Sequence, residues 1–246
     1  MSLANPKPLL LAVALTAALA ACKPAAPAAD AAADANATAA TPAAAESAPA
    51  PATDAASTAN AADATAAPAA PQLQAAMRDL WHGHIVHARD YALAVHAGDK
   101  AGAKSAADAV VANAKDIGNA VGSFYGDAAG AGMLNLLAGH WGAVKAMTDA
   151  RAKNDKAGAD KAMSDLANNA GEIAKFLAGA NPNLPEDTVR GLLLAHGAHH
   201  SKQIDLIDAG DTAGEAAEWT AMQAHMDMIA DALAAAIAKQ FPDKAN

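Results

Sequence analysis

The residues of this chain that could do chemistry are histidines placed at a fixed interval. The 246-residue sequence contains nine histidines, and His84, His140 and His196 follow one another 56 residues apart. The same interval relates two further sets of residues: Asn113, Asn169 and His225, and Asp116, Glu172 and Met228. A repeat of this length predicts stacked supersecondary units, each too small to bury its own apolar face.

The repeat turns scattered donors into an ordered set of candidate metal ligands. The six candidates are His84, Asp116, His140, Glu172, His196 and His225. Imidazole and carboxylate together suit iron, zinc, manganese or copper, and helical bundles with inward-facing His, Asp and Glu often hold metals. The amides of Asn113 and Asn169 would orient such ligands by hydrogen bonds, and Met228 would add a soft donor that favours copper.

Alternative interpretations of these residues remain open at this stage. A histidine paired with a neighbouring polar group inside a bundle is satisfied and needs no metal, so the set could be a hydrogen-bonded layer. A di-iron redox centre and a non-covalent haem are further possibilities, whereas covalent haem is excluded because no Cys-x-x-Cys-His motif exists. His196, His199 and His200 share one helix face and could hold a loosely bound surface ion.

The elements that must position these residues are helices. Alanine dominates the sequence after residue 72, and apolar residues recur at spacings of three and four. Each of the three histidines spaced 56 residues apart lies within such an apolar stripe, as His84 does between Trp81 and Ala88. The pattern predicts an all-α bundle of six helices in three hairpins.

Short polar stretches predict where the helices end. In the three copies, Gly98, Asn154 and Gly210 suit a left-handed residue that closes the first helix. The aspartate that follows in each copy suits the N-cap of the second helix; these residues are Asp99, Asp155 and Asp211. Residues 126–130 and 181–185 are expected to join the hairpins.

The N-terminal segments predict an exported lipoprotein. Residues 1–21 have one cation followed by an apolar stretch, typical of a signal peptide, and the segment ends Leu-Ala-Ala before Cys22. This resembles a bacterial lipobox, in which Cys22 is lipidated and becomes the first mature residue. Residues 22–72 are rich in Ala and Pro and predict a disordered tether; residues 73–246 form the bundle domain.

Charge and composition restrict the partners. The formal net charge is −9 and no basic stripe is present, which argues against a nucleic-acid partner. The expected partner is a membrane, held through the lipid on Cys22, and the expected location is the cell envelope, on the outer membrane facing the periplasm. The sequence does not identify a protein partner.

Several stretches resemble an uncharacterised bacterial family of small helical proteins. They are Asp-Ile-Gly-Asn-Ala at 116–120, Phe-Tyr-Gly at 124–126 and Ala-Asn-Pro-Asn at 180–183, together with Trp81 and His84. The resemblance implies that the polar repeat positions carry the same residue types in that family, and it carries no established activity. Members are sometimes labelled glycosyltransferases, but this chain has no βαβ pattern and no glycine-rich phosphate loop.

Together these features predict a membrane-anchored lipoprotein whose bundle binds iron, copper or zinc, for binding, buffering or sensing. The alternative is a metal-free helical scaffold for an envelope partner, and a di-iron oxygen or redox protein comes third. Catalysis is not favoured, because no serine lies in a nucleophile motif and no Glu-x-x-His pair is present.

Overall fold

The structure is a computed structural model and describes residues 70–245. Within them the chain is all-α, as predicted, and forms six long helices. Their bounds are α1 Pro71–His96, α2 Lys100–Tyr125, α3 Asp127–Arg151, α4 Lys156–Ala180, α5 Glu186–Asp208 and α6 Thr212–Gln240. Helix α1 begins two residues before the predicted domain boundary at 73, because Pro71 suits the first turn of a helix.

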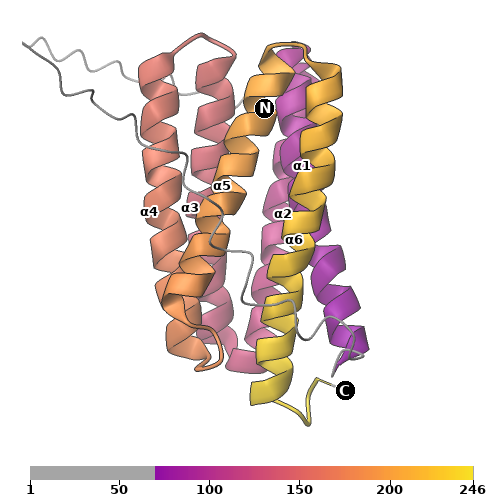
Figure 1. Cartoon of the computed structure of the whole chain (residues 1–246), viewed down its shortest axis with the longest axis vertical. Coiled ribbons are helices and arrows are strands. Elements are labelled where there is room, and N and C mark those ends of the chain that lie inside the picture. The colour runs from indigo at the N-terminus through magenta and orange to yellow at the C-terminus, as the bar shows by residue number, and fades with distance from the viewer. Residues whose placement is uncertain (1–69, 246) are drawn as a thin grey trace, which may run out of the picture. The chain divides into compact units, whose positions relative to one another are not determined.

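The six helices run roughly along one common axis (Figure 1), and the contacts between them close the array into a ring. Each helix packs against its neighbours in the chain, and α6 packs against α1. Helices α1, α3 and α5 also contact one another, so the first helix of every hairpin faces the middle of the bundle. Because the array is closed, side chains from three different hairpins can meet at its axis.

The turns within the three hairpins share one geometry. Gly98, Asn154 and Gly210 have φ angles of 69°, 56° and 69°, the left-handed conformation predicted for these positions. The side chains of Asp99, Asp155 and Asp211 accept hydrogen bonds from the backbone N–H groups of Gly102, Gly158 and Gly214. These bonds satisfy N–H groups at the helix start that have no partner within the helix.

The connection between the first two hairpins is shorter than predicted. Instead of a loop over residues 126–130, Gly126 alone separates α2 from α3. Its φ of 91° and ψ of 161° lie where only glycine is comfortable, which allows the chain to reverse within one residue. A Cβ on Gly130 would lie 2.6 Å from the Gly118 carbonyl oxygen, so the close approach of α2 and α3 also requires glycine there.

The apolar core is divided into two large clusters along the bundle axis. One contains Trp81, Leu137 and Leu193, and the other contains Ala88, Val144 and Ile204. Along α1, α3 and α5, the histidines at 84, 140 and 196 fall between these two sets. A polar layer therefore interrupts the buried core at one level of the bundle.

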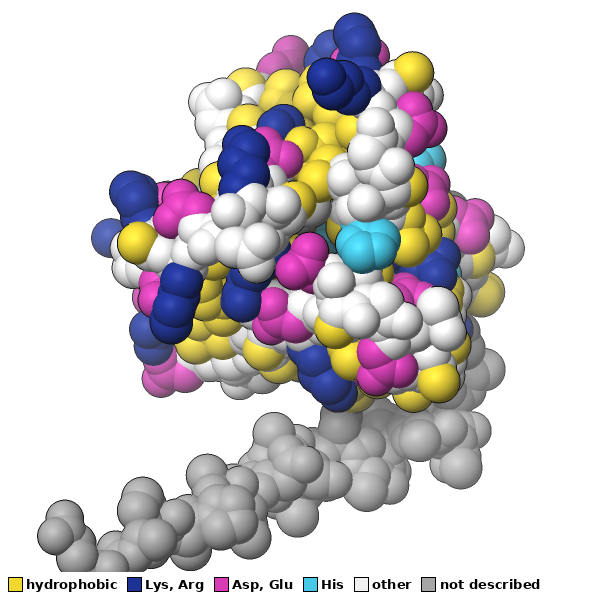
Figure 2. Space-filling model, turned by 90° about the horizontal axis from the view of Figure 1, so that it is seen from above, with side chains coloured by type: hydrophobic (Ala, Val, Ile, Leu, Met, Phe, Trp, Pro, Cys, Tyr) yellow, Lys and Arg dark blue, Asp and Glu magenta, His cyan; other side chains and the backbone are white. Residues whose placement is uncertain are grey.

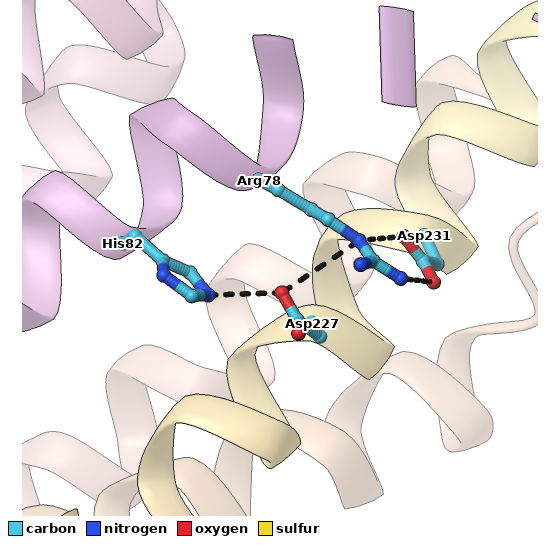
Figure 3. Close-up of polar contacts among 4 residues, drawn as sticks. All are labelled: Arg78, His82, Asp227 and Asp231. Atoms are coloured by element: carbon cyan, nitrogen blue, oxygen red, sulfur yellow. Dashed lines mark hydrogen bonds and ion pairs between the residues drawn. The ribbon is translucent and has the colours of Figure 1, made fainter. Parts of the chain in front are cut away.

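Ion pairs help to close the ring between α1 and α6 (Figure 3). The Arg78 guanidinium donates to both carboxylate oxygens of Asp231, at 2.7 and 2.6 Å. His82 Nε2 lies 2.9 Å from Asp227 Oδ1. Bidentate pairs of this kind fix geometry more strongly than single surface contacts, so the first and last helices are held in a defined register.

Acidic and basic side chains are intermixed on the end of the bundle shown in Figure 2. None of the six helices combines the length and the apolar character needed to cross a bilayer. The predicted signal peptide (1–21), Cys22 and nearly all of the predicted tether (22–72) lie outside the described residues.

Candidate metal centre

Four histidines meet at the polar layer in the middle of the bundle. His84 comes from α1, His140 from α3, and His196 and His200 from successive turns of α5. One ring nitrogen from each lies within 4.8 Å of the corresponding nitrogens of the other three. We call these four residues the histidine centre.

The imidazoles of the histidine centre are buried but poorly satisfied. The exposed fractions are 2%, 4%, 2% and 2% for His84, His140, His196 and His200. His84 Nδ1, His196 Nδ1 and both ring nitrogens of His140 have no hydrogen-bond partner. Such atoms are rare in folded proteins, because an unpaired buried polar group costs about 1–3 kcal/mol.

The rings of the centre pack directly against one another. The closest pair is His196 and His200, with centroids 4.5 Å apart and Nε2 atoms 3.1 Å apart. His140 lies 5.5 Å from both His84 and His196, measured between centroids. The Trp81 ring packs edge-on against the His84 ring, with the ring centroids 6.0 Å apart.

Burial keeps the four imidazoles neutral. It lowers the pKa of His84 to about 3, and repulsion from His140 and His87 adds to that shift. It lowers the pKa of His140 to about 4, although the nearby Asn169 amide offsets part of the effect. The pKa values of His196 and His200 also fall well below the usual value, through burial first and neighbouring imidazoles second. Neutral imidazole is the form that binds metals.

The donor set is close to a four-coordinate site. An ion about 2.0–2.1 Å from four nitrogens in a tetrahedron needs nitrogens about 3.3 Å apart. The His196–His200 pair already has this spacing at 3.1 Å, whereas the widest separation, up to 4.8 Å, must contract by side-chain rotation. The arrangement can therefore hold one ion, with ligands from all three hairpins.

The predicted carboxylate ligands do not join this centre. Asp116 on α2 and Glu172 on α4 are exposed, and so is Met228 on α6, whose exposed fraction is 55%. The expectation that they face the interior is wrong. Asn113 lies at the edge of the buried face of α2. Asp116, three residues further on, projects from the helix about 60° further round, away from the core. The absence of carboxylates from the centre removes the support for a di-iron site of the carboxylate type.

The remaining predicted residues form a separate set, which we call the outer polar layer: Asn113, Asn169 and His225. Each donates a hydrogen bond to the carbonyl oxygen of a leucine on the first helix of its own hairpin. The pairs are Asn113 Nδ2 to Leu80, Asn169 Nδ2 to Leu136 and His225 Nε2 to Leu192, at 2.9, 3.0 and 2.9 Å. His225 was expected to be a ligand, but it is not among the four histidines whose ring nitrogens converge, and its Nε2 is bonded to the Leu192 carbonyl oxygen.

His200 is the candidate ligand that the repeat alone did not reveal. Its repeat mates are Ala88 and Val144, so no histidine recurs at this position, and it was considered only for a surface site with His196 and His199. A signal was present, because Ala88 and Val144 belong to the apolar stripes that predict buried positions. A histidine at a position that is apolar in the other copies is expected to be buried too.

A small cavity adjoins the histidine centre. It has a volume of about 30 Å³ and is lined by His84, His140 and His196 together with apolar side chains, among them Leu193 and Met226. A space of this size accommodates about one water-sized molecule. Part of the centre therefore faces an apolar space rather than packed side chains.

Comparison with known proteins does not extend this description. The chain matches no protein-family model, and no curated protein or solved structure shows significant similarity to it. The resemblance to a bacterial family of small helical proteins therefore stays a prediction.

Proposed function

We propose that this chain is a lipid-anchored envelope protein that binds one transition-metal ion through His84, His140, His196 and His200. Its role is to bind, buffer or sense the ion rather than to turn over a substrate. The observation that carries the proposal is the set of buried imidazole nitrogens without partners. A bound ion would take one nitrogen from each imidazole, and it would give a partner to the His140 ring, which has none on either nitrogen.

The donor set favours copper, and then zinc. All four donors are imidazoles, which suit copper, zinc, iron and nickel, and copper has the highest affinity of these for nitrogen ligands. No carboxylate in the centre balances the charge of the ion.

The metal-free alternative requires the histidines to serve only as a polar layer that sets helix register. The outer polar layer already supplies such a function in every hairpin, because each of its side chains donates a hydrogen bond to the other helix, although Oδ1 of Asn113 and of Asn169 has no partner. A register layer whose nitrogens remain unpaired would lower stability without adding specificity. The geometry therefore supports a ligand role for the histidine centre.

The proposal is tested by metal analysis of the full chain carrying Cys22→Ser, purified without a histidine tag. After incubation with Cu²⁺ or Zn²⁺ and desalting, we expect one ion per chain and a higher melting temperature, which a chelator reverses. His200→Val should lose the ion, and this change is mild because valine occupies the same repeat position at 144.

His96→Ala, at an exposed residue at the end of α1, is the matched control and should retain the ion. A wild-type chain that holds no ion, with a melting temperature insensitive to metal and chelator, would contradict the proposal. The search would then turn to an envelope protein that uses the bundle as a scaffold.

A further inference from the structure

The third hairpin carries imidazoles that the histidine centre does not use. His199 on α5 and His225 on α6 have ring centroids 5.0 Å apart. The His225 ring lies 6.4 Å from that of His196 and nearly parallel to it, at 13°. The rings of His199, His225, His196 and His200 therefore follow one another at contact distance, from a partly exposed position to the middle of the bundle.

The two outer imidazoles each have one nitrogen committed to a hydrogen-bond acceptor. His225 Nε2 must carry a proton, because its partner, the Leu192 carbonyl oxygen, can only accept. His199 Nδ1 faces the carboxylate of the buried Glu218. In the neutral rings, the lone pairs are therefore on His225 Nδ1 and His199 Nε2. A histidine fixed in this way by a carboxylate or a carbonyl is a common form of metal ligand.

The Glu218 carboxylate acts here as a positioning group. Its other oxygen, Oε2, lies 2.6 Å from the Lys202 ammonium, which balances its charge. It therefore orients the His199 ring without offering a free oxygen to a cation. The His199 side chain is 24% exposed, so an ion can reach this ring from solvent.

We propose that His199 and His225 form an outer two-imidazole docking site, from which the metal ion passes through His196 into the histidine centre. The proposal rests on the function proposed above. The ion docks at the two ring nitrogens that these hydrogen bonds leave free, His225 Nδ1 and His199 Nε2. It then exchanges one imidazole for the next and avoids the apolar clusters on either side of the centre, where an ion without ligands would be strongly disfavoured.

The other two hairpins support a special role for the third. The positions equivalent to His199 and His225 are His87 and Asn113 in the first copy, and Ala143 and Asn169 in the second. Only the third copy combines both imidazoles, and it also supplies His200. The repeat thus provides mild substitutions for each member of the pair, because alanine and asparagine occupy these positions elsewhere in the same fold.

The test measures how fast the full chain carrying Cys22→Ser takes up Cu²⁺. Stopped-flow tryptophan fluorescence follows loading, because Trp81 contacts His84 in the centre. We expect His199→Ala and His225→Asn each to slow loading by about tenfold. Metal stoichiometry and equilibrium affinity should stay near the wild-type values, so release should slow in parallel. His225→Asn keeps a donor for the Leu192 carbonyl, as Asn113 and Asn169 do for theirs.

His87→Ala is the matched control, since His87 occupies the same repeat position as His199 and should load at the wild-type rate. Loading at the wild-type rate in both His199→Ala and His225→Asn would overturn the docking site while leaving the histidine centre intact. Loss of stoichiometry in these variants would also overturn it, because the residues would then belong to the centre. A wild-type chain that takes up no copper overturns the proposed function itself.

Discussion

The bundle contains two sets of buried or half-buried polar side chains, and they differ in how they are satisfied. In the outer polar layer, Asn113, Asn169 and His225 each donate to a leucine carbonyl within their own hairpin. In the histidine centre, side chains from three hairpins meet, and four of their ring nitrogens have no partner. The outer polar layer links the two helices of each hairpin, whereas the nitrogens of the histidine centre gain a common partner only if an ion binds there.

This difference separates a structural role from a binding role within one repeat. The outer position holds asparagine in the first two copies and histidine in the third, and either can donate a hydrogen bond to a carbonyl oxygen. Histidine is present in all three copies at the inner position, although it lowers the stability of the metal-free fold. The comparison leads to the following predictions.

The largest expected effect is on metal affinity. His84→Gln should weaken copper binding by at least about 100-fold, because it removes one of four ligands and loss of an outer-shell partner alone costs about 10–100-fold. Asn113→Ala, in the same hairpin, should change the affinity only slightly. Competition titration against a chromophoric chelator measures both. Equal losses in the two variants would show that the two layers are not distinct in function.

Acid should destabilise the metal-free chain through the centre. Burial lowers the folded-state pKa of His140 to about 4, below the ordinary value of 6.5, so the unfolded chain binds more protons between these values. The contribution of neutral His140 to the free energy of unfolding is therefore complete above pH 6.5 and is lost as the pH falls towards 4. In His140→Leu, the drop in the free energy of unfolding between these pH values should be smaller than in the wild type by about 2–3 kcal/mol.

Chemical denaturation of the metal-free chain at pH 6.5 and pH 4 measures the effect. Asn169→Ala, in the outer polar layer of the same hairpin, should keep at least the wild-type dependence on pH, because it leaves the titrating imidazole in place. If His140→Leu and the wild type lose stability equally, His140 is not held neutral by burial.

At neutral pH, substitutions in the two layers should have opposite signs. Asn113→Ala in the metal-free chain should lower the free energy of unfolding by about 1–2 kcal/mol, through loss of a hydrogen bond between helices. His84→Leu should raise it by about 1 kcal/mol, because it replaces a buried unpaired nitrogen with an apolar side chain of similar size. Urea unfolding at pH 7.5 compares them, and a loss of stability in both would refute the contrast.

The smallest effect on stability is expected when all three hairpins carry asparagine in the outer polar layer. His225→Asn gives the third hairpin the residue found at 113 and 169, so the donor to the Leu192 carbonyl is retained. The free energy of unfolding should change by no more than about 0.5 kcal/mol. Thermal melting of the metal-free chain measures this change. A large loss would indicate that His225 has a structural role that asparagine cannot replace.

Much of the fold could be predicted from local sequence. The aspartates at 99, 155 and 211 and the residues before them specify the turns, because caps and left-handed residues depend on bonds between neighbours in the chain. The single-residue connection at Gly126 was missed, since it requires the close approach of α2 and α3 at Gly118 and Gly130. That approach is a property of packing between helices.

The candidate site was predicted in part. Three of its four histidines follow from the repeat, whereas Asp116 and Glu172 were assigned to the interior although both side chains are exposed. Asn113 and Asn169 lie at the edges of the buried faces of their helices. A rotation of about 60° about the helix axis therefore decides whether the side chain three residues further on, Asp116 or Glu172, faces the core or solvent. His200 was missed as an inner ligand because its partners come from α1 and α3, which are distant in sequence.

The sequence by itself determined the helices, their caps and the recurrence of a histidine on each inner stripe, because these depend on side chains within a few residues of one another. Only the tertiary structure decided that the three hairpins close into a ring, with α6 against α1. Closure brings four imidazoles from α1, α3 and α5 to one point and leaves the carboxylates on the outside. The physical reason is that long-range packing sets the rotation of each helix about its own axis, and that rotation selects which side chains meet.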